Sequence, residues 1–500
     1  MSGLPGAAFF FDELGRFYRA RRLHIDTDLR YVESIAATRN DKFHSAIRQY
    51  CRALRDLIAD VDAKAGNGDP HEANAGDRLH EEVPRLLQAL LDSLHQHLPK
   101  GFRLDIARRY HPRFSFADVH PGAHISLRAI DAIAASYHRK IAGLLPGGAA
   151  EPPLVQMTST GEFRLILPDP AVVLGLVGTL PIEVDPVVFR SRAIRLSDLA
   201  VLSLPRWCPA HVRYAALIAH ETLHRLFAFA EYVYAFLPVA EGGVEESSTI
   251  VDQLAAALGA PLLRFVSAAT PLRKALVRIR GGADLHGRFL GYVSELQIDA
   301  AAFVLGGPAY VYALLPMLLS KLGTEEVLDR ENHLAHPPAC VRVESLCCVM
   351  EHAGFGSEAS FVRRGFAQAV GHLAPRDREP PLPVFGEWVR AQRDDMLNFV
   401  DRFASLVVES VVVSEQTPVP WLYHPVNPCV KEWGARECEI LALVRDEDTG
   451  KRFDSFDADE VLSAGWRIAM QDSHRGAGLA EWRVALALSR SGMLYERGDD

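Results

Sequence analysis

The chain has 500 residues, 49% hydrophobic and 23% charged, which is ordinary for a globular protein and leaves room for two to four domains. Its formal net charge of −9 gives no support to a role in binding nucleic acid. Seven cysteines, an odd number with no CxxC pair, argue against a disulfide framework and favour a reducing, cytoplasmic compartment.

Residues 1–150 are expected to form a helical N-terminal domain. The apolar run at 7–11 precedes its nearest basic residues rather than following them, so it lacks the pattern of a secretory signal. Apolar side chains recur with helical spacing over 43–58. Ala63–Asp77, rich in Gly, Asn and Asp, predicts a loop, and Leu145–Pro153, rich in Pro and Gly, predicts a linker.

The second predicted domain, residues 151–375, begins with β-like sequence. Glu162–Leu167 follows a Ser-Thr-Gly turn signal and predicts a strand, and Ala171–Val177 predicts a second strand or a short helix. We therefore expect a small sheet ahead of a long helical region.

The pentapeptide His220-Glu221-Thr-Leu-His224 lies in the apolar, helix-forming run 214–227. Histidines four residues apart share one helix face, so both imidazoles can bind one zinc ion. Glu221 can then act as general base on water at the metal's open position. The alternative is two surface histidines beside an unrelated Glu, but the apolar flanks predict a buried helix, where unpaired polar groups are costly. The pattern indicates a zinc-dependent hydrolase.

A catalytic zinc ion needs a third protein ligand. Glu245 and Glu246 lie about twenty residues after the pentapeptide, and Glu295 lies farther along. Glu295 and Asp299 are four residues apart among apolar neighbours, so Glu295 can bind the metal while Asp299 orients a histidine ring. We favour Glu295 and keep Glu245 and Glu246 open.

The run Ala300–Leu319 comes closest to a membrane span, but it contains Gly-Gly-Pro, and we expect a buried helix pair. Cys347 and Cys348 lie in an apolar helical run and are expected in the core. Leu373–Pro383 predicts a second linker, followed by a helical C-terminal domain, residues 376–500.

Three motifs follow one another between residues 155 and 350. They are His220–His224, then Glu295-x-x-x-Asp299 followed by Ala-Ala-x-x-x-x-Gly-x-Pro, then His336-Pro-Pro-x-x-x-Arg342. In this order they resemble the gluzincin zinc metallopeptidases of the HtpX and CAAX prenyl endopeptidase family. The resemblance implies a mainly α (α+β) fold, with a zincin-type helical metallopeptidase core, a small β-sheet and helical flanks.

The same resemblance implies roles for the motif residues. Glu295 is the third zinc ligand, Asp299 supports a ligand from behind, and Arg342 pairs with the acidic helix. His336 stabilises the oxyanion or, in a latent state, occupies the open zinc position. The alternative interpretation is that His336-Pro-Pro only forms the turn at the start of a helix. Family members are often embedded in membranes, whereas this sequence has no convincing span, so it resembles a soluble variant.

We therefore expect a zinc-dependent endopeptidase that acts on a protein or peptide substrate, with Zn²⁺ as cofactor and Glu221 as general base. Activity that stays latent until regulated is compatible with the long helical flanks, which offer room for a regulatory protein. The alternatives are a non-proteolytic, zinc-stabilised binding or regulatory protein and a metal-free helical scaffold.

Overall fold

The computed structural model describes the chain in separate ranges. These are 123–145, 152–158, 163–167, 200–205, 212–236, 259–276, 283–321, 336–373, 383–410, 421–445 and 456–471, with single positions between 30 and 59. They are mostly helical with one small sheet, which confirms the predicted class at that level. The predicted loop at 63–77, the element predicted at 171–177, and Glu245 and Glu246 lie outside the described residues.

The chain divides into two compact units, one of residues 1–121 and 150–206, the other of residues 122–149 and 207–500. The first unit holds a three-stranded sheet in the order β1-β3-β2. Its strands are β1 (Leu154–Thr158), β2 (Arg164–Ile166) and β3 (Val201–Pro205). β1 runs parallel to β3, and β2 runs antiparallel to it. The sheet expected ahead of the long helical region is therefore present, with β2 inside the predicted strand.

The second unit is helical where described, and it holds the candidate site residues that the structure describes. Its elements are α5 (Ala123–Ala142), η3 (Val212–Leu217), α8 (Ile218–Phe236), α10 (Ala260–Leu276), α11 (Ala283–Lys321), α13 (Ala339–His352), α14 (Gly356–Leu373), α15 (Pro383–Ala391), α16 (Arg393–Ser410), η4 (Pro428–Glu432), α17 (Trp433–Arg445) and α18 (Ala458–Gln471). The helical structure predicted beyond residue 385 is confirmed in α15 to α18.

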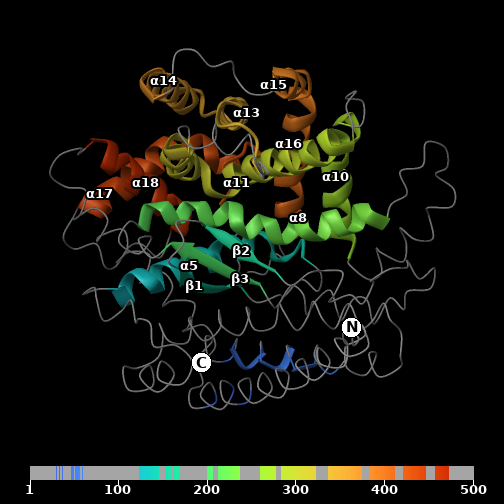
Figure 1. Cartoon of the computed structure of the whole chain (residues 1–500). Coiled ribbons are helices and arrows are strands. Elements are labelled where there is room, and N and C mark those ends of the chain that lie inside the picture. The colour runs from blue at the N-terminus through green and yellow to red at the C-terminus, as the bar shows by residue number, and fades with distance from the viewer. Residues whose placement is uncertain are drawn as a thin grey trace, which may run out of the picture. The chain divides into compact units, whose positions relative to one another are not determined.

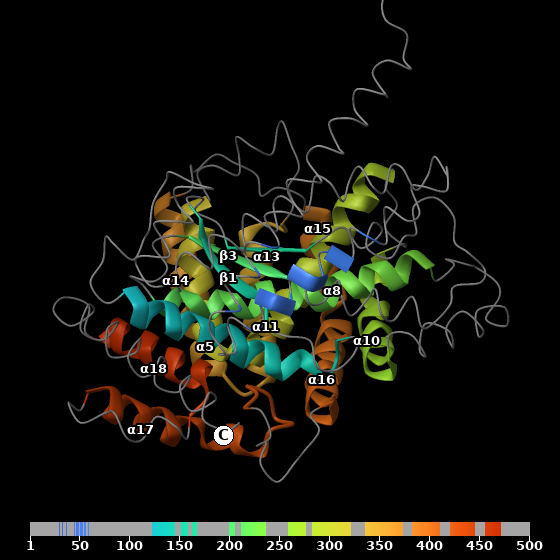
Figure 2. The ribbon, with the colours of Figure 1, turned by 90° about the horizontal axis from the view of Figure 1, so that it is seen from below.

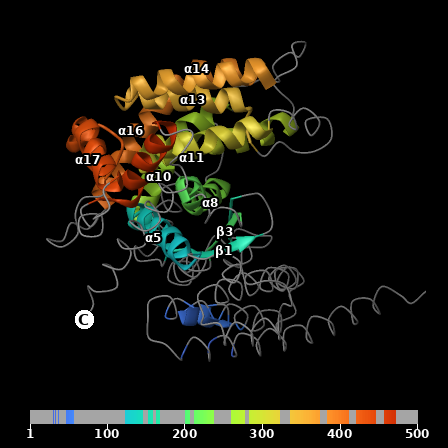
Figure 3. The ribbon, with the colours of Figure 1, turned by 90° about the vertical axis from the view of Figure 1, so that its left-hand side faces the viewer.

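Helix α11 is the centre of this unit. It packs between α8 and α13 (Figure 1). Helices α10 and α16 run side by side (Figure 2), and their aromatic side chains, with Phe227 of α8, make edge-to-face contacts. Figure 3 shows α13 and α14 together as a layer over α11. The packing thus lays the helix that carries His220 and His224 directly against the helix that carries Glu295.

The long apolar helix α11 has a break at Gly307, whose backbone is non-helical with φ 59° and ψ −152°. Within the described residues, Phe289–Leu315 is one helix long and apolar enough to cross a membrane, and 94% of its most apolar window is buried inside the protein. A core helix passes the same test of length and composition. The pair of buried helices predicted at Ala300–Leu319 is thus confirmed, because two helical segments of α11 meet there at the kink at Gly307.

The kink frees carbonyl groups that other segments satisfy. Pro308 has no N–H to donate to the carbonyl of Val304, and the N–H of Tyr423 donates to that oxygen instead, at 2.9 Å. The ammonium of Lys140 donates to the next carbonyl, that of Leu305, at 3.1 Å. Helix α5 and the segment that begins at residue 421 therefore stabilise the break in α11.

Lys140 also joins α5 to α18 through a buried ion pair. Its ammonium lies 2.6 Å from Asp459 Oδ1, and the two side chains are 2% and 0% exposed. Burial raises the pKa of Asp459 to about 7, because Lys140 only partly offsets the loss of water around the carboxylate.

We expect Asp459→Asn to flatten the dependence of stability on pH between about pH 4 and pH 7. The pKa of Asp459 is higher in the folded state than the ~3.9 of an unfolded chain, so the folded state binds the proton more tightly. The free energy of unfolding then falls as pH rises through this window, by up to ~1.4 kcal/mol per pH unit. Urea titrations of both proteins across the window measure the difference. Burial also raises the pKa of Glu460, but this group is present in both proteins, so the comparison isolates Asp459. Equal slopes would contradict the expectation.

Candidate metal centre

Helix α8 presents His220 and His224 to one point. The helix begins at Ile218 after the 3-10 turn η3, so the first part of the run predicted as one helix is more tightly wound. The histidine rings, one turn apart, pack edge to face, with centroids 4.8 Å apart. Their Nε2 atoms lie 3.1 Å from each other. His220 is almost fully buried and His224 is partly exposed.

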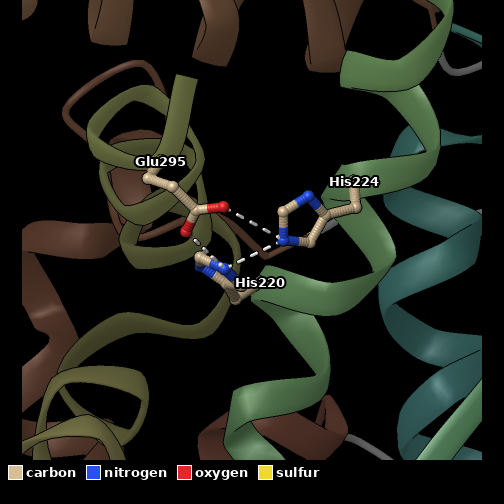
Figure 4. A group of neighbouring side chains, drawn as sticks. All are labelled: His220, His224 and Glu295. Carbon is tan, nitrogen blue, oxygen red and sulfur yellow. Dashed lines mark hydrogen bonds and ion pairs between the residues drawn. The ribbon is translucent and has the colours of Figure 1, made fainter. Parts of the chain in front are cut away.

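Glu295 of α11 reaches both histidines (Figure 4). Its Oε2 lies 3.3 Å from His220 Nε2, and its Oε1 lies 3.6 Å from His224 Nε2. A tetrahedral zinc ion with bonds of ~2.0–2.1 Å would hold its ligand atoms ~3.3 Å apart. The three donors thus have the chemistry and the spacing of a zinc ligand set.

The buried oxygen Glu295 Oε2 makes no hydrogen bond of acceptable geometry within the described part of the chain. His336 Nδ1 lies 2.9 Å from it, yet the two atoms are not oriented to form a hydrogen bond. A buried carboxylate oxygen without a hydrogen bond is costly, and a cation would satisfy it. The donor set therefore fits a metal ion.

Asp299 lies one turn beyond Glu295 on α11 and is buried behind His220. Its Oδ1 is 3.0 Å from His220 Nδ1. Arg342 of α13 donates two hydrogen bonds to Asp299, each 2.7 Å long. This fork fixes the carboxylate, and the carboxylate in turn orients the His220 ring so that Nε2 faces Glu295.

Tyr310 is a fourth member of this hydrogen-bonded group, and the sequence interpretation missed it. Its hydroxyl donates to Asp299 Oδ1 and lies 3.2 Å from His220 Nδ1. Its only sequence signal is its place just after Gly-Gly-Pro, which predicts a break in the helix but not the direction of the turn.

The charges at this centre favour a cation. Burial opposes protonation of His220, but the neighbouring carboxylates of Asp299 and Glu295 outweigh burial and raise its pKa to about 10. Burial also opposes ionisation of the two carboxyl groups, yet their charged partners hold both pKa values below the ordinary range. Burial lowers the pKa of His224. Two ionised carboxylates in a buried place attract a positive charge, whether a proton or a metal ion.

The remaining predicted residues lie around this cluster. Glu221 is buried on α8, close enough to His224 for its charge to favour protonation of that ring. His336, with 41% of its side chain exposed, stands just before α13, where Pro338 is the N-cap residue. The helix-start interpretation of His336-Pro-Pro is therefore confirmed, and His336 also lies beside Glu295. Its role at an oxyanion or at the open zinc position stays a prediction. Cys347 is buried, as expected of a core residue, whereas Cys348 is only half-buried.

A second group, His352, Asp401 and His424, also brings ligand atoms together. Asp401 Oδ1 lies 2.7 Å from His352 Nε2 and 2.9 Å from His424 Nε2. However, the N–H of Val426 donates to His424 Nδ1, so the proton of the neutral ring is on Nε2 and points to Asp401. A metal would need that nitrogen unprotonated, so the geometry favours hydrogen bonds that join α13, α16 and the segment at residue 424.

No family model, curated protein or solved structure matches this chain. The cluster around His220, His224 and Glu295 is therefore the main indication of what this chain does.

Proposed function

We propose that this chain is a zinc-dependent peptidase with a zincin-type core. The observation that carries the proposal is the convergence of His220, His224 and Glu295 from two helices, with donor atoms 3.1–3.6 Å apart. Two imidazoles and one carboxylate are the ligands of many hydrolytic zinc sites, which keep a further position open. Asp299, held by Arg342, supports the ligand set from behind.

A bound zinc ion would supply Lewis-acid chemistry, polarising the scissile carbonyl and lowering the pKa of a coordinated water. Glu221, between the two histidines in sequence, takes the proton of the attacking water and passes it to the leaving nitrogen. His336, half-exposed at the start of α13, donates a hydrogen bond to the oxygen on which negative charge develops. The substrate is a protein or peptide. In a latent state, the His336 side chain would instead occupy the open position of the metal and block access of the substrate.

The proposal is tested by zinc content and peptide cleavage. We expect the purified protein to hold one equivalent of zinc, to cleave casein or a peptide library, and to lose cleavage to a chelator and regain it with zinc. Glu221→Gln keeps the shape of the side chain but cannot take a proton, so we expect cleavage to fall at least ~100-fold while zinc stays bound.

Full cleavage by Glu221→Gln would rule out this mechanism. A wild-type protein that holds zinc, unfolds when the zinc is removed and cleaves nothing would instead be a zinc-stabilised binding protein. Cleavage that begins only when another protein is added would place the activity under the control of a regulatory partner.

A further inference from the structure

We propose that Tyr310 is a positioning residue of the metal centre, whose hydroxyl fixes the ring of His220 in the orientation and protonation that zinc binding requires. The inference rests on the proposed zinc site. It adds to the motif residues a group that belongs to none of the three motifs.

The hydrogen bonds around His220 decide which nitrogen carries the proton. The single hydroxyl proton of Tyr310 goes to Asp299 Oδ1, because an ionised carboxylate can only accept. The phenol oxygen is left as an acceptor, 3.2 Å from His220 Nδ1, and Asp299 Oδ1 is a second acceptor at 3.0 Å. Two acceptors face Nδ1, so in the neutral ring Nδ1 carries the proton, and Nε2 is the nitrogen that a metal would bind in place of a proton.

The Tyr310 ring also limits how the His220 ring can turn. The two rings are nearly parallel, with an interplanar angle of 10° and centroids 6.2 Å apart. Both side chains are buried, so neither the hydroxyl nor Nδ1 can exchange its partner for bulk water. Orientation and protonation of His220 are therefore set by the same neighbour.

Tyr310 reaches Asp299 only because α11 is kinked. The two residues are eleven apart, and in a straight helix they would be displaced by ~16 Å along the axis. That separation exceeds the combined reach of the two side chains. The break at Gly307 turns the second half of the helix so that the hydroxyl meets the carboxylate. The kink and the hydrogen bond are thus one feature of the structure.

The kink is held from outside α11. The N–H of Tyr423 and the ammonium of Lys140 bind the carbonyls of Val304 and Leu305, just before the break. The ring of Tyr423 covers Gly307 so closely that an added Cβ would lie 2.5 Å from it. The contacts that set the place of Tyr310 in the folded chain therefore include no metal ion, as positioning requires.

The test compares Tyr310→Phe with Tyr312→Phe. Both changes remove one buried hydroxyl from the same half of α11, and the Tyr312 hydroxyl has no hydrogen-bond partner in the described part of the chain. Zinc affinity is measured by competition with a chromogenic chelator, and the visible absorption of the Co²⁺-substituted proteins reports the geometry at the ligands. Urea titrations of the metal-free proteins report stability.

We expect Tyr310→Phe to bind zinc ~10–100-fold more weakly, the usual cost of losing a group that supports a ligand, and to change the Co²⁺ spectrum. Tyr312→Phe should leave both unchanged. Wild-type zinc affinity and an unaltered Co²⁺ spectrum in Tyr310→Phe would overturn the inference. A wild-type protein that binds zinc but cleaves nothing would overturn the peptidase proposal and leave the inference on Tyr310 standing.

Discussion

Glu295→Ala is expected to abolish tight zinc binding. Its carboxylate supplies one of three converging donors, and among the described residues its Oε2 has no hydrogen-bond partner. The binding free energy of zinc at a four-ligand protein site is about 10–16 kcal/mol, or ~3 kcal/mol for each ligand. Loss of one ligand should therefore lower the zinc affinity by on the order of 100-fold or more. Chelator competition and the metal content after dialysis measure the change.

The matched control addresses the ligand choice that the sequence left open. Glu245 and Glu246 are the other candidates for the third ligand, so the double variant Glu245→Ala/Glu246→Ala should retain one equivalent of tightly bound zinc. The opposite pattern, with zinc lost from the double variant and kept by Glu295→Ala, would assign the third ligand to the nearer pair.

Arg342→Met is expected to destabilise the metal-free protein by about 3–5 kcal/mol. The guanidinium is nearly buried and donates both of its hydrogen bonds to Asp299, which is 1% exposed. Methionine keeps much of the volume of the arginine but removes the guanidinium that offsets the Asp299 charge together with His220, and a poorly compensated buried charge is costly. Urea unfolding in the presence of a chelator measures the loss apart from any effect on metal binding.

Arg363→Met is the control for this change. Arg363 also binds carboxylates, those of Glu344 and Glu351, but its side chain is 38% exposed. Exposed ion pairs contribute about 0–1 kcal/mol, so the control should unfold close to the wild-type urea concentration. Similar losses of unfolding free energy in the two variants would contradict the expectation, because the buried pair of Arg342 and Asp299 would then contribute no more than the exposed pairs of Arg363.

The parts of the site that are local in sequence were open to prediction. His220 and His224 are one turn apart, and so are Glu295 and Asp299, because helical periodicity alone places residues four apart on one face. The presence of helices and of a small sheet followed from apolar spacing and turn residues in the same way. These features need no knowledge of how one helix packs on another.

Tyr310 and the residues that hold the kink were not open to prediction. The hydroxyl reaches Asp299 only after α11 has turned, and the turn depends on Tyr423 and Lys140, more than a hundred residues away on either side. Gly-Gly-Pro indicates that a helix breaks, but the angle is set by what packs against it. Contacts across such distances in sequence are decided by tertiary packing, which a single sequence does not display.

The closure of the kink also has a consequence for the order of events during synthesis. A ribosome releases the proposed metal ligands His220, His224 and Glu295 well before Tyr423, the residue whose backbone N–H closes the break in α11. Domains generally fold from the N-terminal side as they emerge. The ligand set can therefore be exposed to the metal pool of the cell while Tyr310 is not yet held in place, and the final arrangement of the centre is reached late, when the segment at residue 421 has joined the unit.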